Sequence, residues 1–179
     1  IGTFLPKGNK LLIVVNGAYG HRIANICDYM DRPYTVLETP EDTPPDIAAV
    51  SETLAANPDI SHVVVVHCET TSGILNPIQE IAAAVAAAGR NLMIDAMSAF
   101  GAIPLDLSQI PCDAVAASSN KCFEGVPGLG FVLCRKMALE QTRANSHSLS
   151  LDLFDQWQAM EENGQWRFTP PTHVVVAFE

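Results

Sequence analysis

The sequence predicts an α/β fold in three layers, with a mostly parallel sheet between helices on both faces. Short apolar runs alternate along the chain with stretches whose apolar residues recur at helical spacing. The apolar runs are unbroken, which is typical of strands that are buried on both faces of a parallel sheet. At 179 residues the chain is long enough for one well-packed domain and short for two.

The first half of the chain contains three strand patterns, each followed by a helix pattern. In order, these are a strand at 11–16, a helix at 19–30, a strand at 34–37, a helix at 47–56, a strand at 61–67 and a helix at 77–88. The last of these helices has Pro77 in its first turn and Gly89 just past its end. Both residues are typical of those positions.

The second half predicts three more strands, at 91–95, 113–117 and 130–134, and then two helices, at 136–144 and 151–163. The chain begins with Ile1 rather than Met and ends in the apolar run 174–179. Both ends look cut, and we expect the sequence to be a piece of a longer chain.

Composition excludes several classes of function. Twenty acidic residues against ten basic ones give a net charge of −10, and no cluster of Lys and Arg offsets it. We therefore expect no nucleic-acid partner. The five cysteines form no C-x-x-C pair, no apolar stretch is long enough to cross a membrane, and no signal peptide is recognisable. These features predict a cytoplasmic protein with reduced thiols and no membrane contact.

Polar residues gather where four of the predicted strands end. In sheets of this kind ligands bind outside the carboxyl ends of the strands, and the segments that follow them are 16–17, 67–73, 95–98 and 118–121. The stretch NGAYG at 16–20 lacks the spacing of a dinucleotide or phosphate loop, and we interpret it as a tight turn from strand to helix. The segment 67–73 (HCETTSG) is either a polar ligand platform or a helix-entry loop with capping hydroxyls.

Two residues stand out as candidates for chemistry. Lys121 follows a buried strand among small residues, where a crevice could lower the pKa of its amine and make it nucleophilic; the alternative is an ordinary solvated lysine. Asp95 ends an apolar strand, where an acid needs a partner. It could hold a cationic ring nitrogen, or simply cap the next segment. No second acid or histidine lies nearby at ligand spacing, so we expect no metal.

Three runs together resemble a known family. HCETTSGILNP, IDAMSAFGAIPLD and ASSNKCFEGVPGLGFV occur in this order and are similar to the class V (fold type I) aminotransferases, which use pyridoxal 5′-phosphate (PLP). The similarity extends over about 11–135 and resumes at 167–172 (RFTPPT). It implies that residues 1–145 are part of the PLP-binding large domain. Residues 146–179 would continue that domain through the FTPP segment and stop before a C-terminal small domain.

The resemblance also implies roles for single residues. Lys121 would form the Schiff base with PLP and move the proton between substrate and cofactor. Asp95 would hold the pyridine nitrogen, Thr70 would bond near the ring O3′, and Asn120 would lie beside the cofactor or substrate. Thr169 would reach the cofactor phosphate of the neighbouring subunit in a homodimer, a role for which Thr172 is a rival.

Within the family, the resemblance is strongest to enzymes that move the amino group of 2-aminoethylphosphonate to pyruvate. This reaction of phosphonate degradation gives phosphonoacetaldehyde and L-alanine. An alanine– or serine–glyoxylate aminotransferase is an alternative, and so is a catalytically silent α/β domain that only binds a partner. The family's N-terminal phosphate-binding segment and its C-terminal substrate-binding arginine are not in this sequence. We therefore expect that the chain alone neither folds stably nor turns over well.

Overall fold

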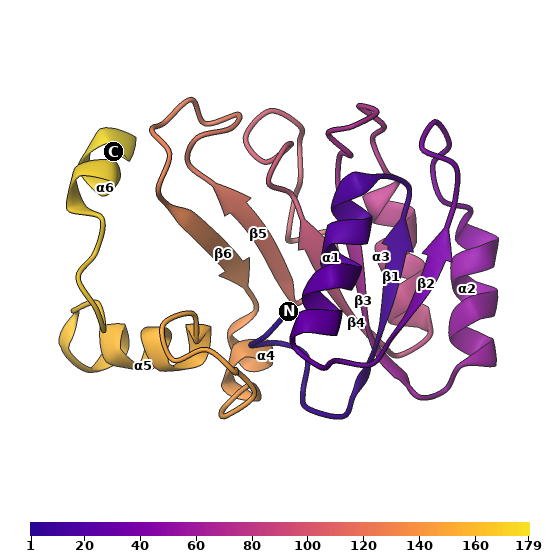
Figure 1. Ribbon diagram of the computed structural model, residues 1–179, viewed down its shortest axis with the longest axis horizontal. Helices are drawn as coiled ribbons and strands as arrows, with labels where there is room; N and C mark the ends of the chain where they lie inside the picture. Colours follow the sequence, from indigo (N-terminus) through magenta and orange to yellow (C-terminus); the bar gives the residue numbers. More distant parts are fainter.

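The fold is built on one six-stranded sheet. The computed structural model describes residues 1–179. The strand order is β2-β1-β3-β4-β5-β6 (Figure 1), and the strands are β1 (Lys10–Val15), β2 (Tyr34–Glu38), β3 (Ile60–Val66), β4 (Asn91–Asp95), β5 (Ala114–Ser118) and β6 (Gly130–Cys134). The first five strands pair in parallel, and β6 pairs antiparallel with β5. The predicted mostly parallel sheet is confirmed.

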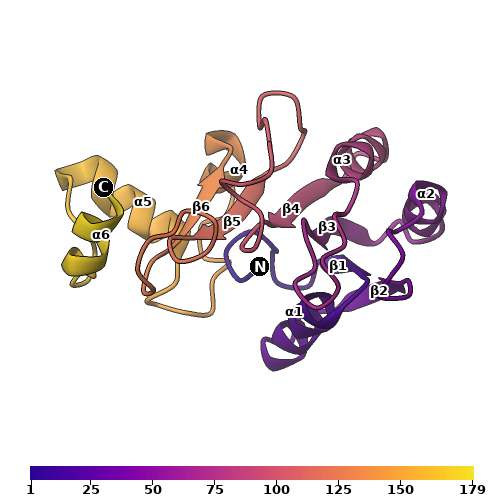
Figure 2. The same ribbon diagram turned by 90° about the horizontal axis from the view of Figure 1, so that it is seen from above.

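Helices cover both faces of this sheet, which confirms the three layers. They are α1 (Ala18–Tyr29), α2 (Ile47–Ala56), α3 (Ile78–Ala87), α4 (Lys136–Glu140), α5 (Leu153–Asn163) and α6 (Thr172–Phe178). Seen from above, α1 lies on one face and α2 and α3 lie on the other (Figure 2). None of these helices has the length and apolar character that crossing a bilayer requires.

The strands bury apolar side chains on both faces because successive side chains point to opposite sides. One core lies under α2 and α3 and includes Leu12, Val63 and Val65. The other lies under α1 and includes Ile13, Val64 and Val66. The apolar runs of the sequence are therefore unbroken because these strands are buried on both faces of the sheet, as predicted.

The C-terminal part differs most from the prediction. The helix predicted at 136–144 ends at Glu140, because the chain turns there: Ala144 has a left-handed φ of 64° and the Thr142 hydroxyl donates back to the Leu139 carbonyl at 2.7 Å. The helix predicted from 151 begins at Leu153, because the side chain of Asp152 caps it and accepts from the Phe154 N–H at 3.0 Å. Helix α6 was not predicted.

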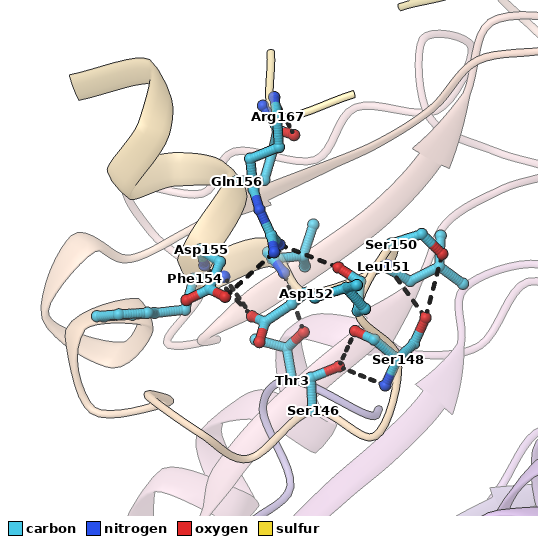
Figure 3. A network of polar contacts seen from close by, with 12 residues as sticks. Thr3, Ser146, Ser148, Ser150, Leu151, Asp152, Phe154, Asp155, Gln156 and Arg167 are labelled. Carbon is cyan, nitrogen blue, oxygen red and sulfur yellow. Dashed lines mark hydrogen bonds and ion pairs between the residues drawn. The ribbon is translucent and has the colours of Figure 1, made fainter. Parts of the chain in front are cut away.

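A polar network fixes the segment that leads to α6 (Figure 3). Arg167 pairs with Asp155 of α5 at 3.3 Å and donates to the Leu149 carbonyl at 3.0 Å. Its backbone N–H also donates to the Gln156 side chain at 3.4 Å. The start of the FTPP segment is thereby attached to α5.

His62 of β3 gives the stability of the fold a pH dependence. The ring is 6% exposed and hydrogen-bonds to Ser61 at 2.8 Å and Asn91 at 3.1 Å. Burial lowers its pKa from 6.5 to about 4, although the nearby Asp113 carboxylate opposes this. In the unfolded chain the ring takes up a proton below about pH 6.5, whereas in the folded chain it does so only near pH 4. The contribution of neutral His62 to the free energy of unfolding is therefore fully present above pH 6.5 and is lost as the pH falls towards 4.

We expect the free energy of unfolding to fall by about 3 kcal/mol from this residue between pH 7 and pH 4. Urea unfolding of the complete protein at a series of pH values measures the decline. His62→Gln should flatten it, while the same replacement at the exposed His173 controls for general effects of losing a histidine. An equal decline in the His62→Gln protein would contradict this assignment.

Candidate functional site

The candidate site lies at the edge of the sheet where β1 to β5 end. Because these strands are parallel, the segments that follow them emerge side by side, at the top of Figure 1. The four polar segments singled out from the sequence belong to this edge. We expected the site outside the carboxyl ends of the strands. The structure brings the four polar segments together at that place.

Asp95 is the last residue of β4 and lies beside an apolar cavity of about 230 Å³. One carboxylate oxygen accepts the Met97 N–H at 3.0 Å. Burial raises the pKa of Asp95, the Met97 N–H opposes that rise, and the negative charge of Glu69 adds to it, while Arg22 and Lys121 act in the opposite direction. An acid in such surroundings is stabilised as a carboxylate by a cationic partner.

Lys121 lies in the connection between β5 and β6. Ser119 holds the two arms of this connection together. It is 0% exposed, its hydroxyl donates to the Val126 carbonyl at 2.7 Å, and its carbonyl accepts from the Gly125 N–H at 2.8 Å. The side chain of Lys121 is itself exposed. This differs from the crevice that the sequence suggested. Phe178 of α6 packs against Phe123 of the same loop, but the Lys121 side chain stays uncovered. Its charge nevertheless lowers the pKa of Asp95, so the two candidates lie close enough at this edge to interact electrostatically.

Glu69 is a residue of the site that sequence reasoning missed. It is 0% exposed, and its carboxylate accepts from the backbone N–H of Gly20 at 2.8 Å and of Tyr19 at 3.3 Å. It thus caps the N-terminus of α1 from a loop about 50 residues away, in place of the side chain that Gly17 lacks. A Cβ on Gly17 would lie 2.6 Å from the Glu69 Cδ. The signal in the sequence was an acid after a strand and a helix without its own cap.

The tight turn predicted at NGAYG is confirmed, since α1 begins at Ala18, three residues after β1 ends. Asn16 in this turn is buried and pairs reciprocally with Asn76, at 2.8 and 3.0 Å between the two amides. Asn76 also donates to the Val66 carbonyl at 2.8 Å. These bonds join the ends of β1 and β3.

Ser118 is a second residue that the sequence reasoning missed. Its hydroxyl is buried and has no hydrogen-bond partner. It ends β5, two residues beyond Ala116, which pairs with Asp95. Because side chains alternate along a strand, Ser118 faces the same side of the sheet as Asp95. A buried hydroxyl without a partner is a position where a ligand's polar group is favoured.

The other predicted residues lie in different surroundings. Thr70 and Asn120 are both exposed, on the loops after β3 and β5 at the same edge. No hydrogen bond joins either side chain to Asp95 or Lys121. Thr169 and its rival Thr172 are exposed near the start of α6, at the side of the sheet beyond β6 (Figure 1). The role expected for Thr169 is in a neighbouring subunit, and it stays a prediction.

Comparison with known sequences gives one family. The family model for aminotransferase class V matches residues 2–179. The 2-aminoethylphosphonate–pyruvate transaminase 1 of Paraburkholderia xenovorans is 55% identical over 178 residues, which cover 99% of this chain and 46% of that protein. The corresponding transaminase of Pseudomonas fluorescens Pf0-1 is 54% identical over 177 residues, covering 99% and 48%. The chain spans about half the length of the curated relatives it matches.

Comparison with solved structures gives the same fold. Pyridoxamine–pyruvate aminotransferase from Mesorhizobium loti superposes with a TM-score of 0.89 at 27% identity, covering 99% of this chain and 46% of that one. A Thermus thermophilus aspartate aminotransferase gives a TM-score of 0.87 at 26% identity, covering 99% and 49%. The three layers and the carboxyl edge described above are therefore shared with aminotransferases.

Proposed function

The chain belongs to the class V aminotransferases, and on that premise we propose that it carries the centre of a PLP site in an enzyme that transfers the amino group of 2-aminoethylphosphonate to pyruvate. The products would be phosphonoacetaldehyde and L-alanine. The observation that carries the proposal is the identity of 54–55% to transaminases of that name across nearly the whole chain. The alanine–glyoxylate aminotransferase of Nostoc shares the fold at 17% identity, which does not favour its substrates.

The residues at the carboxyl edge fit this cofactor. Asp95 offers a half-buried carboxylate that a cation would stabilise, and the protonated pyridine nitrogen of PLP is such a cation. Lys121 offers an exposed primary amine in the same site. Ser118 offers a buried hydroxyl without a partner on the same face. Thr70 and Asn120 lie on the adjoining loops, where they could donate to polar groups of the cofactor or substrate.

Each residue then has a chemical task. PLP, when bound, supplies an electron sink for the charge that develops on the substrate carbon bearing the amino group. Lys121 would attach the cofactor through its Nζ. Its amine would then move the proton from that carbon to the cofactor in the first half of the reaction, and from the cofactor to the pyruvate-derived carbon of alanine in the second half. Asp95 keeps the ring nitrogen protonated and oriented. Its apolar surroundings strengthen that pairing, because charges interact more strongly where water is excluded.

An amino-donor comparison tests the proposal. The complete protein with PLP is given 2-aminoethylphosphonate, alanine or serine, with pyruvate or glyoxylate as acceptor. Alanine should form fastest from 2-aminoethylphosphonate and pyruvate. Faster turnover of alanine or serine with glyoxylate would favour the other branch of the family. No transfer from any donor by a folded protein would favour a silent binding domain.

We also propose a cytoplasmic homodimer in which Thr169 of each subunit serves the partner's cofactor. The exposure of Thr169 at the side of the sheet supports this arrangement, as does the attachment of its segment to α5 through Arg167. Light scattering on the complete protein measures the mass. A monomeric mass in an active preparation would contradict the shared site.

A further inference from the structure

Ser98 hydrogen-bonds to both neighbouring loops of the site. It lies three residues after Asp95, in the turn that follows β4. Its hydroxyl donates to the backbone carbonyl of Cys68 at 2.5 Å, on the loop after β3. Its backbone carbonyl accepts from the Cys122 thiol at 3.2 Å, on the loop after β5. The two partners are 30 residues before it and 24 residues after it along the chain.

These contacts join the segments that carry the candidate residues. Cys68 directly precedes Glu69 and Thr70, and Cys122 directly follows Lys121. The last backbone bonds between the strand ends are those from His67 to the Asp95 carbonyl, at 2.7 Å, and from Ala96 to the Ala116 carbonyl, at 2.9 Å. Past that point, the two bonds of Ser98 are the hydrogen bonds that connect the turn after β4 to the loops on either side.

The loop after β3 depends on Ser98 more than the loop after β5 does. Toward β5, Phe100 also packs against Phe123, with ring centroids 5.7 Å apart, so apolar contact supports that loop as well. Toward β3, the Glu69 carboxylate anchors the loop to α1, but no aromatic contact joins the exposed segment from Thr70 to Gly73 to the turn after β4. The hydroxyl bond to Cys68 is therefore the contact whose loss should change the site most.

We propose that Ser98 is a positioning residue of the site, whose hydroxyl holds the loop of Thr70 at a fixed place relative to Asp95 and Lys121. This inference rests on the proposed function, because it concerns how the residues of that site are aligned. Ser98 itself need not touch cofactor or substrate. Its effect passes through the Cys68 carbonyl to the backbone of Glu69 and Thr70.

Two measurements on Ser98→Ala test the inference. The first is hydrogen–deuterium exchange of the complete protein without PLP, where amides in 68–73 should exchange about fivefold faster, since one hydrogen bond of ordinary strength is lost. The second uses the PLP-loaded protein. We expect kcat to fall about fivefold while KM for pyruvate stays within about twofold, because alignment rather than acceptor binding is disturbed. Ser98→Thr, which keeps the hydroxyl, should restore both values.

Ser108→Ala is the matched control, since that hydroxyl bonds to Asp106 on an exposed loop away from the three segments. Unchanged exchange at 68–73 in Ser98→Ala would overturn the inference. Faster exchange with an unchanged kcat would overturn the positioning role as well. If the unsubstituted protein forms no PLP adduct at Lys121, the proposed function itself fails and the positioning role fails with it. If the adduct forms, a negative result at Ser98 concerns Ser98 alone.

Discussion

Replacing Lys121 by alanine is expected to abolish the adduct that borohydride fixes between PLP and the protein, and to lower the transamination rate roughly 10²- to 10⁴-fold. The amine of this exposed side chain is the group that would both attach the cofactor and carry the proton. The loop itself is closed by Ser119, whose bonds do not involve the Lys121 side chain. The fold around the site should therefore survive the substitution.

Mass spectrometry of the reduced, digested complete protein locates the pyridoxyl group. In the unsubstituted protein we expect it on the peptide that contains Lys121, and in Lys121→Ala we expect no specific adduct. Lys7→Ala, which removes an exposed lysine from the N-terminal segment, should leave both adduct and rate unchanged. A folded, unsubstituted protein whose pyridoxyl group is absent from Lys121 would rule out the aminotransferase assignment of this residue.

The second large effect is expected at Asp95. Asp95→Asn keeps the size of the side chain and an oxygen for the Met97 N–H, but it removes the charge that would hold the pyridine nitrogen protonated. We expect the rate to fall about 10²- to 10³-fold. The PLP-free protein should become more stable, because burial raises the pKa of this acid and its ionised form is therefore disfavoured in the fold.

The combination of lower activity and higher stability distinguishes this role from a structural one. Thermal unfolding without PLP and steady-state rates with PLP measure the two effects on the same preparations. Asp113→Asn is the control, since Asp113 accepts the Leu92 N–H at 2.8 Å at the opposite edge of the sheet. Loss of stability together with loss of activity in Asp95→Asn would indicate that Asp95 serves the fold rather than a cofactor.

Much of the fold could be predicted because its signals are local. Strands β4 and β6 and helix α2 have the bounds that the apolar patterns predicted. Gly89 also follows α3 with a left-handed φ of 68°, as expected of a residue after a helix. Helix α6 was missed because its three consecutive valines, Val174 to Val176, favour a strand by local preference. Packing of Phe178 against Phe123 and Phe131 accompanies the helix instead.

The candidate site could be predicted in part for the same reason. Asp95 ends one recognisable strand and Lys121 follows another, so the rule for parallel sheets predicts that both lie at the same edge. The contributions of Glu69, Ser98 and Ser118 depend on partners that are distant in sequence, or on the absence of any partner. Pattern and spacing carry no information about such contacts.

The cap that Glu69 places on α1 restricts what the site can bind. A helix N-terminus at the edge of a parallel sheet commonly binds phosphate or phosphonate. Here the Glu69 carboxylate of the same chain already occupies that position. That carboxylate is tethered, so an incoming anion competes with an internal ligand present at a very high effective concentration. A dissolved phosphonate would have to displace it and leave a fully buried acid with only the Thr71 hydroxyl, at 3.5 Å, as a partner. The anionic groups of PLP and of the proposed substrate would therefore be held by other donors, because the N-terminus of α1 is already occupied.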